Sequence, residues 1–123
     1  MRSAVVLLVD DEPSVLAVTR MVFKLAGFTV LSASSPNEAL ELWRSRSSEI
    51  EVLVADFELG DSVTGQQLSQ ALRAEKPDLK TILLSAYPLD RRFDGRVEGV
   101  DFFQKPYECD SLVRAVRRHI SDR

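Results

Sequence analysis

The feature that most constrains this chain is an alternation between two apolar patterns. Short, mainly apolar runs are separated by stretches in which apolar residues recur every three or four positions. Continuous runs rich in Val, Ile, Leu and Phe are typical of strands buried on both faces, whereas the wider spacing is typical of amphipathic helices. The runs cover residues 4–9, 28–31, 52–55, 81–84 and 100–103.

Strands that alternate with helices predict a parallel sheet, because right-handed crossovers return the chain to the same edge. We therefore predict an α/β fold, a doubly wound five-stranded parallel sheet with helices on both faces. Residues 88–99 contain two glycines and few apolar residues, which predicts a short or irregular helix there. The apolar faces of the other predicted helices are Val15, Val18, Val22 and Leu25; Ala39, Leu40 and Trp43; Leu68, Ala71 and Leu72; and Leu112, Val113, Val116 and Ile120.

Local signals delimit these helices. Ser35, Pro36 and Glu38 fit a capping box with proline in the first turn, and Pro77 prevents continuation of the third helix. Gly27 is a stop signal after the first helix.

Length and composition exclude several classes of protein. The chain has 123 residues, 45% of them hydrophobic, which predicts one domain over residues 1–123. Sixteen basic and nineteen acidic side chains give a net charge of −3, which argues against direct nucleic-acid binding. The apolar runs are too short to span a membrane, and there is no signal peptide pattern. Cys109 is the only cysteine, which excludes an internal disulfide. We expect a cytoplasmic domain.

Polar side chains follow four of the five predicted strands. In a parallel sheet, these strand ends meet at one edge, where α/β proteins bind ligands. Each residue alone is commonly a helix cap or a turn residue, but this combination is hard to assign to capping. The residues are Asp10, Asp11 and Glu12 after the first run, Asp56 after the third, Ser85 after the fourth and Lys105 after the fifth.

Converging carboxylates repel one another, and a divalent cation that prefers oxygen ligands relieves the repulsion. The pair Asp10 and Asp11 is therefore predicted to hold Mg²⁺. Asp56 then becomes a nucleophile for phosphorus, because a carboxylate beside such an ion can form an aspartyl phosphate. Lys105 neutralises phosphoryl oxygens and Ser85 donates a hydrogen bond to them.

Other sites are poorly supported. The turn after the first strand has no glycine and three acidic residues, which excludes a glycine-rich phosphate-binding loop. The only histidine, His119, is expected to be a solvated residue near a helix C-terminus.

These strand ends resemble the receiver domain of two-component response regulators. The matching segments are Val-Asp10-Asp11-Glu12-Pro13, Val54-Ala55-Asp56, Leu84-Ser85-Ala86 and Phe102-Phe103-Gln104-Lys105-Pro106, and the likeness covers essentially the whole chain. The resemblance implies the strand order 2-1-3-4-5.

The resemblance also implies roles for single residues. Asp56 would accept a phosphoryl group from the phosphohistidine of a histidine kinase or a histidine phosphotransfer protein. Asp10, Asp11, Asp56 and the backbone carbonyl of Glu58 would hold Mg²⁺. Ser85 and Phe102 would be the switch residues. Phosphorylation would remodel the face formed by residues 88–99, 100–103 and 110–119, through which the domain would bind an effector or a second copy of itself.

The chain departs from the family pattern after Asp56. Gly60 stands where the family commonly has proline, and the loop before Gly65 has one extra residue, which predicts a freer loop. Glu58 is either a charge that tunes the lifetime of the phosphate or a solvated loop residue, and Tyr87 is a second candidate gate for attacking water. Residues Arg91, Arg92, Arg96, Arg114, Arg117 and Arg118 predict a basic face that is either solvated or a contact for an acidic partner.

Two alternative functions remain open at this point. A pseudo-receiver would have the same fold and serve as an interaction or dimerisation module without phosphorylation. A haloacid-dehalogenase-like phosphatase would also use an aspartate nucleophile and Mg²⁺, although its Asp-x-Asp motif does not match Asp10-Asp11-Glu12. The phosphoacceptor hypothesis predicts a regulatory domain rather than an enzyme acting on other substrates.

Overall fold

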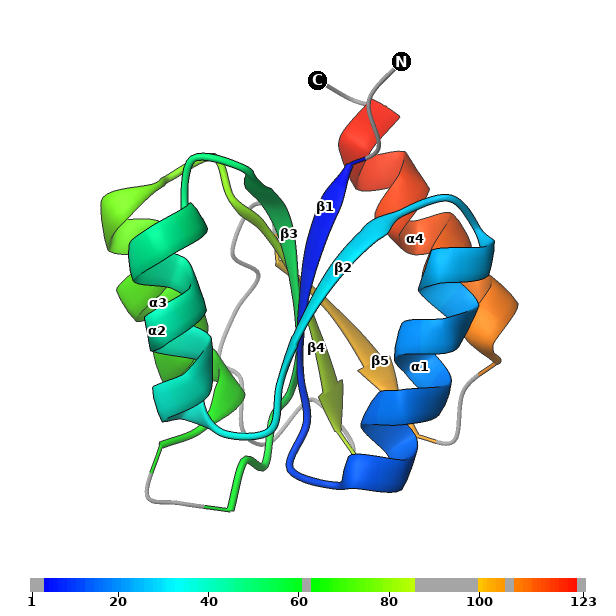
Figure 1. The fold of residues 1–123 in the computed structure, drawn as a ribbon, viewed down its shortest axis with the longest axis horizontal. Helices are drawn as coiled ribbons and strands as arrows, with labels where there is room; N and C mark the ends of the chain where they lie inside the picture. The colour runs from blue at the N-terminus through cyan, green and yellow to red at the C-terminus, as the bar shows by residue number, and fades with distance from the viewer. Residues whose placement is uncertain (1–3, 61–62, 86–99, 106–107, 122–123) are drawn as a thin grey trace.

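The computed structural model describes residues 4–60, 63–85, 100–105 and 108–121. Helices and strands alternate along most of this length, as the apolar pattern predicts (Figure 1). The strands are β1 (Val5–Val9), β2 (Thr29–Ala33), β3 (Ile50–Asp56), β4 (Lys80–Ser85) and β5 (Val100–Gln104). The helices are α1 (Pro13–Leu25), α2 (Pro36–Arg46), α3 (Gly65–Glu75) and α4 (Cys109–Ser121).

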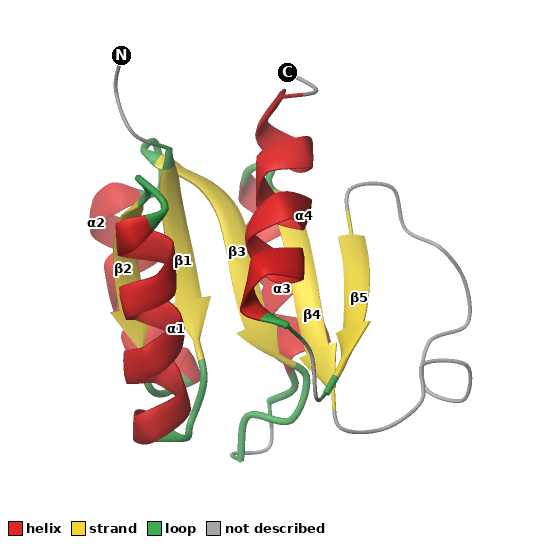
Figure 2. Ribbon diagram, turned by 90° about the vertical axis from the view of Figure 1, so that its right-hand side faces the viewer, coloured by secondary structure: helices red, strands yellow, loops and turns green. Residues whose placement is uncertain are grey.

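The strands form a single parallel sheet in the order β2-β1-β3-β4-β5. Helices α1 and α4 cover one face of the sheet, and α2 and α3 cover the other (Figure 1). All arrowheads point to the same edge of the sheet, so the carboxyl ends of the strands lie together (Figure 2). The predicted fold class and the strand order are confirmed.

The sheet separates two hydrophobic layers, which explains the unbroken apolar runs. Along β1, Leu7 packs in the layer beneath α2 and α3, whereas Val6 and Leu8 pack in the layer beneath α1 and α4. Each of these side chains is at most 2% exposed. Successive strand residues point to opposite faces, so a strand covered on both sides must be apolar at every position.

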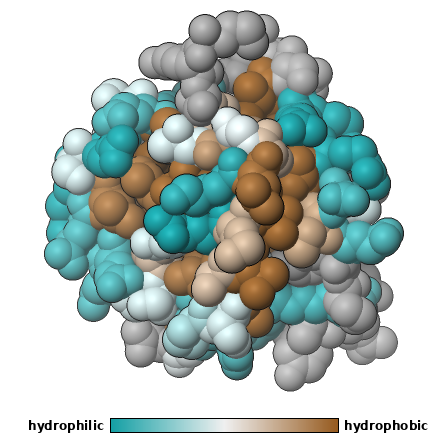
Figure 3. Space-filling model, turned by 45° about the vertical axis from the view of Figure 1, so that its right-hand side comes forward, coloured by the Kyte–Doolittle hydropathy of each residue, from teal (hydrophilic) through white to brown (hydrophobic). Residues whose placement is uncertain are grey.

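The predicted apolar face of α1 is only half right: Val22 packs against the layer beneath the helix and Val15 is partly buried, but the other two residues are exposed. Val18 is 58% exposed and Leu25 is 83% exposed, whereas Thr19 and Phe23 are buried. The helix is apolar on more than one side, so periodicity alone cannot decide which side packs on the sheet. Figure 3 brings this side of the molecule forward and shows apolar surface among hydrophilic side chains.

The other helices follow the predictions more closely. Trp43 of α2 is 2% exposed, and its Nε1 donates a hydrogen bond to Glu75 at 2.9 Å. In α3, Leu68 and Leu72 are buried as predicted, but Ala71 is exposed and Ser69 is buried instead. The buried hydroxyl of Ser69 lies 2.9 Å from that of Thr81 on β4, which satisfies both polar groups.

The helix ends show one cap that was predicted and one that was not. Ser35 accepts a hydrogen bond from Glu38 N at 3.2 Å, but the Glu38 carboxylate binds Ser34 N rather than Ser35 N. A reciprocal capping box begins α3 instead, where Thr64 and Gln67 bind each other's backbone N–H groups.

Helix α4 packs its predicted face on the sheet and turns Arg114, Arg117 and Arg118 to solvent. His119 is not solvated: its side chain is 14% exposed and its Nε2 lies 2.8 Å from Asp101 Oδ2 on β5. Residues 88–99, together with Tyr87, Pro106 and the three arginines between residues 91 and 96, lie outside the described residues. Within the described ranges, no helix is long and apolar enough to cross a membrane.

Candidate functional site

Four of the five strands deliver a polar side chain to the shared carboxyl edge. Asp10 follows β1 directly, Asp56 ends β3 and Ser85 ends β4. Lys105 follows β5, and its backbone N–H donates to the carbonyl of Ser85 at 2.7 Å. The structure therefore brings together the residues that the sequence placed at separate strand ends.

Three carboxylates converge at this edge. Asp10, Asp11 and Asp56 each offer an oxygen atom, and these atoms lie within 4.8 Å of one another. Asp10 and Asp56 are each 5% exposed, and Asp11 lies at the surface. Oxygen donors at this spacing suit a hard divalent cation.

The turn into α1 holds Asp10 in place. Glu12 N donates a hydrogen bond to Asp10 Oδ1 at 2.9 Å, and Pro13 begins the helix. A short acidic side chain can bind the backbone two residues ahead, so the sequence Asp-Asp-Glu-Pro builds its own turn. The first carboxylate is thus oriented by local sequence.

Lys105 pairs with the phosphoacceptor candidate. Its Nζ lies 3.0 Å from Asp56 Oδ2, and the Asp56 side chain is 7% exposed. The other oxygen, Asp56 Oδ1, is buried and has no hydrogen-bond partner among the described residues. A buried polar atom without a partner is unfavourable, which marks Oδ1 as the atom that a ligand would contact.

Burial raises the pKa of Asp56 above its ordinary value of 3.8, against the opposing effects of the Lys105 hydrogen bond and charge. Burial also raises the pKa of Asp10, while the hydrogen bond from the Glu12 backbone and the charge of Lys105 oppose this rise. In both cases, desolvation of the carboxylate is the dominant cause. The charged form of both carboxyl groups is therefore unfavourable at this site, and a bound cation would stabilise it.

Ser85 and Glu58 form a contact that sequence reasoning missed. The Ser85 hydroxyl, on a residue that is 3% exposed, donates to the Glu58 carboxylate oxygens at 3.3 and 3.5 Å. Glu58 is half-buried, and its contact with Ser85 favours a role at the site over a fully solvated loop residue. Its place two residues after Asp56 was the only signal in the sequence.

Phe102 lies on β5 and is half-buried. Its ring centroid is 6.3 Å from that of Phe57, the residue that follows Asp56. The candidate switch residue thus lies close to the loop that follows Asp56, a pairing between two strands that no local sequence pattern indicates.

Backbone contacts join the two ends of the loop between β3 and α3 to each other. Glu58 and Thr64 form an antiparallel bridge, and Gly65 N donates to Phe57 O at 2.8 Å. A Cβ at Gly65 would lie 2.3 Å from Asp56 O, so only glycine permits this close approach. These contacts join the two described ends of the loop, and the predicted freedom of its middle part falls on residues 61–62, which lie outside the described residues.

Gly60 of this loop lies close to Asp11. It has a φ of +78°, and a Cβ there would meet Asp11 Oδ2 at 2.9 Å. Glycine in place of proline thus allows the backbone to approach the acidic cluster.

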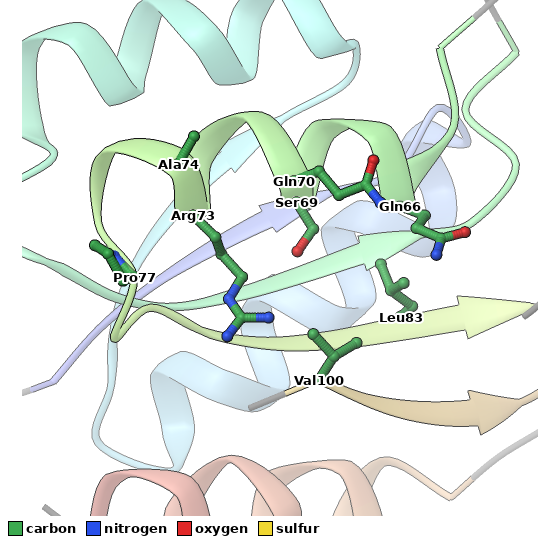
Figure 4. A pocket seen from close by; sticks show the side chains of 8 residues that line it. All are labelled: Gln66, Ser69, Gln70, Arg73, Ala74, Pro77, Leu83 and Val100. Carbon is green, nitrogen blue, oxygen red and sulfur yellow. The ribbon is translucent and has the colours of Figure 1, made fainter. Parts of the chain in front are cut away.

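A pocket of about 340 Å³ lies elsewhere, between α3 and the strands β4 and β5. Figure 4 shows Ser69, Arg73, Leu83 and Val100 among the side chains that line it. None of the residues that line this pocket is acidic, so the candidate chemistry lies at the strand ends and not in this pocket.

Comparison with known proteins agrees with this geometry. Residues 6–117 match the family described as response regulator receiver domain. The chain is 32% identical to the sensor kinase CckA of Brucella abortus over 124 residues, which cover 94% of this chain and 12% of that protein. It is 30% identical to the probable transcriptional regulatory protein TcrX of Mycobacterium tuberculosis over 114 residues, covering 91% of this chain and 47% of TcrX.

Solved structures have the same fold. A response regulator receiver domain protein from Clostridium thermocellum superposes with a TM-score of 0.88 at 25% identity, covering 97% of this chain and 95% of that one. A response regulator from Thermotoga maritima gives 0.81 at 27% identity, with coverage of 97% and 98%. This chain spans less than half the length of the curated relatives above. It belongs to the response regulator receiver domain family of two-component signal transduction.

Proposed function

We propose that this receiver domain is a phosphoryl-accepting switch whose acceptor is Asp56. The observation that carries the proposal is the pairing of the two Asp56 oxygens. Oδ2 is held by Lys105 at 3.0 Å, whereas the buried Oδ1 has no hydrogen-bond partner among the described residues. The carboxylate is thus oriented by one oxygen and can react through the other.

The acidic residues fit an Mg²⁺ ion. We propose that Asp10, Asp11, Asp56 and the backbone carbonyl of Glu58 hold it, since carboxylate and carbonyl oxygens are ligands that Mg²⁺ prefers. The hydrogen bond that closes the loop is accepted by Phe57 O rather than by Glu58 O. When bound, Mg²⁺ would neutralise charge on the phosphoryl oxygens.

The phosphoryl donor is a phosphohistidine on a histidine kinase or a histidine phosphotransfer protein. A lone pair of Asp56 Oδ1 forms the new O–P bond as the P–N bond breaks, and the electron pair of that bond returns to the imidazole nitrogen. Lys105 offsets charge on the transferred group, and the Ser85 hydroxyl donates a hydrogen bond to it. The products are an aspartyl phosphate and a free histidine.

The acceptor must be ionised to attack. Because burial raises the pKa of Asp56, we expect the rate of phosphorylation to fall as the pH decreases through that raised value.

Phosphorylation then shifts the conformational population. The added negative charge draws Ser85, which ends β4, and Lys105, which follows β5, toward Asp56. Phe102 on β5 follows, which changes the face formed by residues 88–99, β5 and α4. A downstream effector or a second copy of the domain binds this face, so the chain is a regulator that catalyses only its own phosphorylation and dephosphorylation.

We further propose that residues 1–123 form one receiver domain that works in the cytoplasm without binding nucleic acid or membrane directly. The small net charge of −3 supports a protein partner over a nucleic-acid partner.

The test is the intact mass of the protein after incubation with acetyl phosphate and Mg²⁺. We expect one added phosphoryl group on the wild type, and none in Asp56→Asn or with a metal chelator. If acetyl phosphate leaves the mass unchanged, a phosphohistidine protein is tried as donor, because a protein donor supplies its own binding energy. If both donors fail although Mg²⁺ binds, the chain is a pseudo-receiver and the proposal is wrong.

A further inference from the structure

The hydroxyl of Ser85 is engaged before any phosphoryl group arrives. It donates to the Glu58 carboxylate at 3.3 and 3.5 Å from a residue that is only 3% exposed. Both contacts are long, so the hydrogen bond is weak, but its acceptor is ionisable and the contact is partly buried. Glu58 thus occupies the hydroxyl that the phosphorylated state would use.

The backbone holds Glu58 in this position. Phe57 N donates to Leu84 O at 2.6 Å, directly before Ser85, and Gly65 N donates to Phe57 O at 2.8 Å. The bridge between Glu58 and Thr64 fixes the loop from the other side. The side chains of Glu58 and Ser85 therefore meet because the loop after β3 is anchored to the end of β4, and not by chance at a mobile surface.

A serine hydroxyl has a single proton to donate. While Glu58 accepts it, a phosphoryl oxygen on Asp56 cannot. Glu58 also adds a fourth carboxylate to an edge where Asp10, Asp11 and Asp56 already converge. We propose that Glu58 is an inhibitory acceptor that holds Ser85 in the unphosphorylated position, so that phosphorylation must break this contact before the switch can turn.

This inference rests on the proposed function and goes beyond it. It assigns the threshold of the switch to one side chain outside the set that contacts the phosphoryl group. A receiver with this contact has a smaller active population before phosphorylation than one without it, because the unphosphorylated state alone contains the Ser85–Glu58 hydrogen bond.

The experiment measures affinity for beryllofluoride, a non-covalent mimic of the phosphoryl group, by calorimetry at saturating Mg²⁺. We expect Glu58→Ala to tighten binding about fivefold to tenfold, just below the usual range for a hydrogen bond to a charged group, because both contacts are long. Glu58→Gln keeps an acceptor but removes the charge, so we expect a gain of only about twofold.

Two controls separate the hydroxyl from simple charge. Glu12 is exposed and its side chain caps nothing, so Glu12→Ala removes a nearby negative charge without touching Ser85. We expect it to change the affinity by less than about twofold. In a Ser85→Ala background, the gain from Glu58→Ala should also shrink below about twofold, because the hydroxyl that Glu58 withholds is gone.

The outcomes distinguish failure of the inhibitory contact from failure of the proposed phosphorylation of Asp56. If Glu58→Ala binds no more tightly than the wild type, or if its gain persists in the Ser85→Ala background, the inhibitory contact is wrong while phosphorylation of Asp56 stands. The same conclusion follows if Glu58→Gln reproduces the whole gain, because charge alone then explains it. If Ser85→Ala binds too weakly to measure, the comparison of Glu58→Ala, Glu58→Gln and Glu12→Ala decides. A wild type that neither binds beryllofluoride nor accepts a phosphoryl group overturns both proposals.

Discussion

Two buried carboxylates share one nearby lysine at the strand ends. Asp10 and Asp56 are each 5% exposed, and Lys105 forms an ion pair with Asp56. Burial of charge without full compensation is unfavourable, and the raised pKa values of both carboxyl groups express that cost. At this scale, the residues that suit the site for a cation and a phosphoryl group weaken the fold.

The first prediction concerns Asp10→Asn, which should raise the melting temperature at pH 7 by a few degrees. An asparagine oxygen can still accept the hydrogen bond from Glu12 N but carries no charge. The folded-state pKa of Asp10 is raised, so its folded state binds the proton more tightly than the unfolded state. The wild type therefore loses stability as the pH rises from 3.8 through the raised pKa.

Thermal unfolding of both proteins across this pH range, without Mg²⁺, checks the sign. The gain from Asp10→Asn should vanish below pH 3.8, where the carboxyl group is protonated in both states. Asp11→Asn is the matched control, because Asp11 is exposed, and it should change the melting temperature far less. A wild type as stable as Asp10→Asn at pH 7 would contradict the assignment of strain to burial.

At the scale of elements, α1 shows how a helix can be apolar on two sides while only one side packs. Phe23 is fully buried against the sheet, whereas Met21 is 63% exposed on the same helix. The large contact area of Phe23, which includes the Phe28 ring at 5.4 Å, decides which side faces inward.

The second prediction follows from this orientation. Phe23→Ala should lower the free energy of unfolding by about 3–5 kcal/mol, because it leaves a cavity in the layer beneath α1 and α4. Met21→Ala, two residues away, should change it by less than about 0.5 kcal/mol. Urea titrations of the two variants measure the difference, and equal losses would show that the packed side of α1 is assigned incorrectly.

The third prediction concerns the cap of α3. Thr64→Ala removes the acceptor for Gln67 N, which lies 3.1 Å away, and should cost about 1 kcal/mol of unfolding free energy. Thr64→Ser keeps the hydroxyl and should retain most of the stability. Amide hydrogen exchange at Gly65 should accelerate in Thr64→Ala, since that N–H closes the loop onto Phe57 O. Unchanged exchange at Gly65 would mean that the cap does not hold the loop.

At the scale of the whole molecule, the parallel sheet joins stability to the site. Every strand runs between the two hydrophobic layers and ends at the same edge, so the groups that repel one another are fixed by the core itself. A ligand that binds only this assembled edge must stabilise the entire fold by mass action.

The fourth prediction is that Mg²⁺ stabilises the chain globally. At a concentration ten times its dissociation constant, it should add about 1.4 kcal/mol to the free energy of unfolding. The gain should be lost in Asp11→Asn, which removes one of the three converging carboxylates. Trp43 of α2, which is 2% exposed and is not one of the proposed metal ligands, reports unfolding by fluorescence. Equal stabilisation of the variant would argue against this site.

The sequence predicted most of the site but not its internal contacts. Asp10, Asp56, Ser85 and Lys105 were found because each stands at the end of a strand or directly after it, and strand ends in a parallel sheet share an edge. The contacts of Ser85 with Glu58 and of His119 with Asp101 join residues on different elements. Their meeting depends on how the loop and the helix pack, which no local pattern records.

By itself, the sequence determined the order of strands and helices, the fold class and the chemistry available at one edge. Burial on both faces demands continuous apolar runs, and those runs are visible in the chain without any partner. Only the tertiary structure decided which side of α1 is buried, that His119 pairs with Asp101, and that Glu58 accepts from Ser85. These contacts depend on packing between residues distant in sequence. The arrangement of lowest free energy is set by how the assembled layers pack together, and not by any one segment.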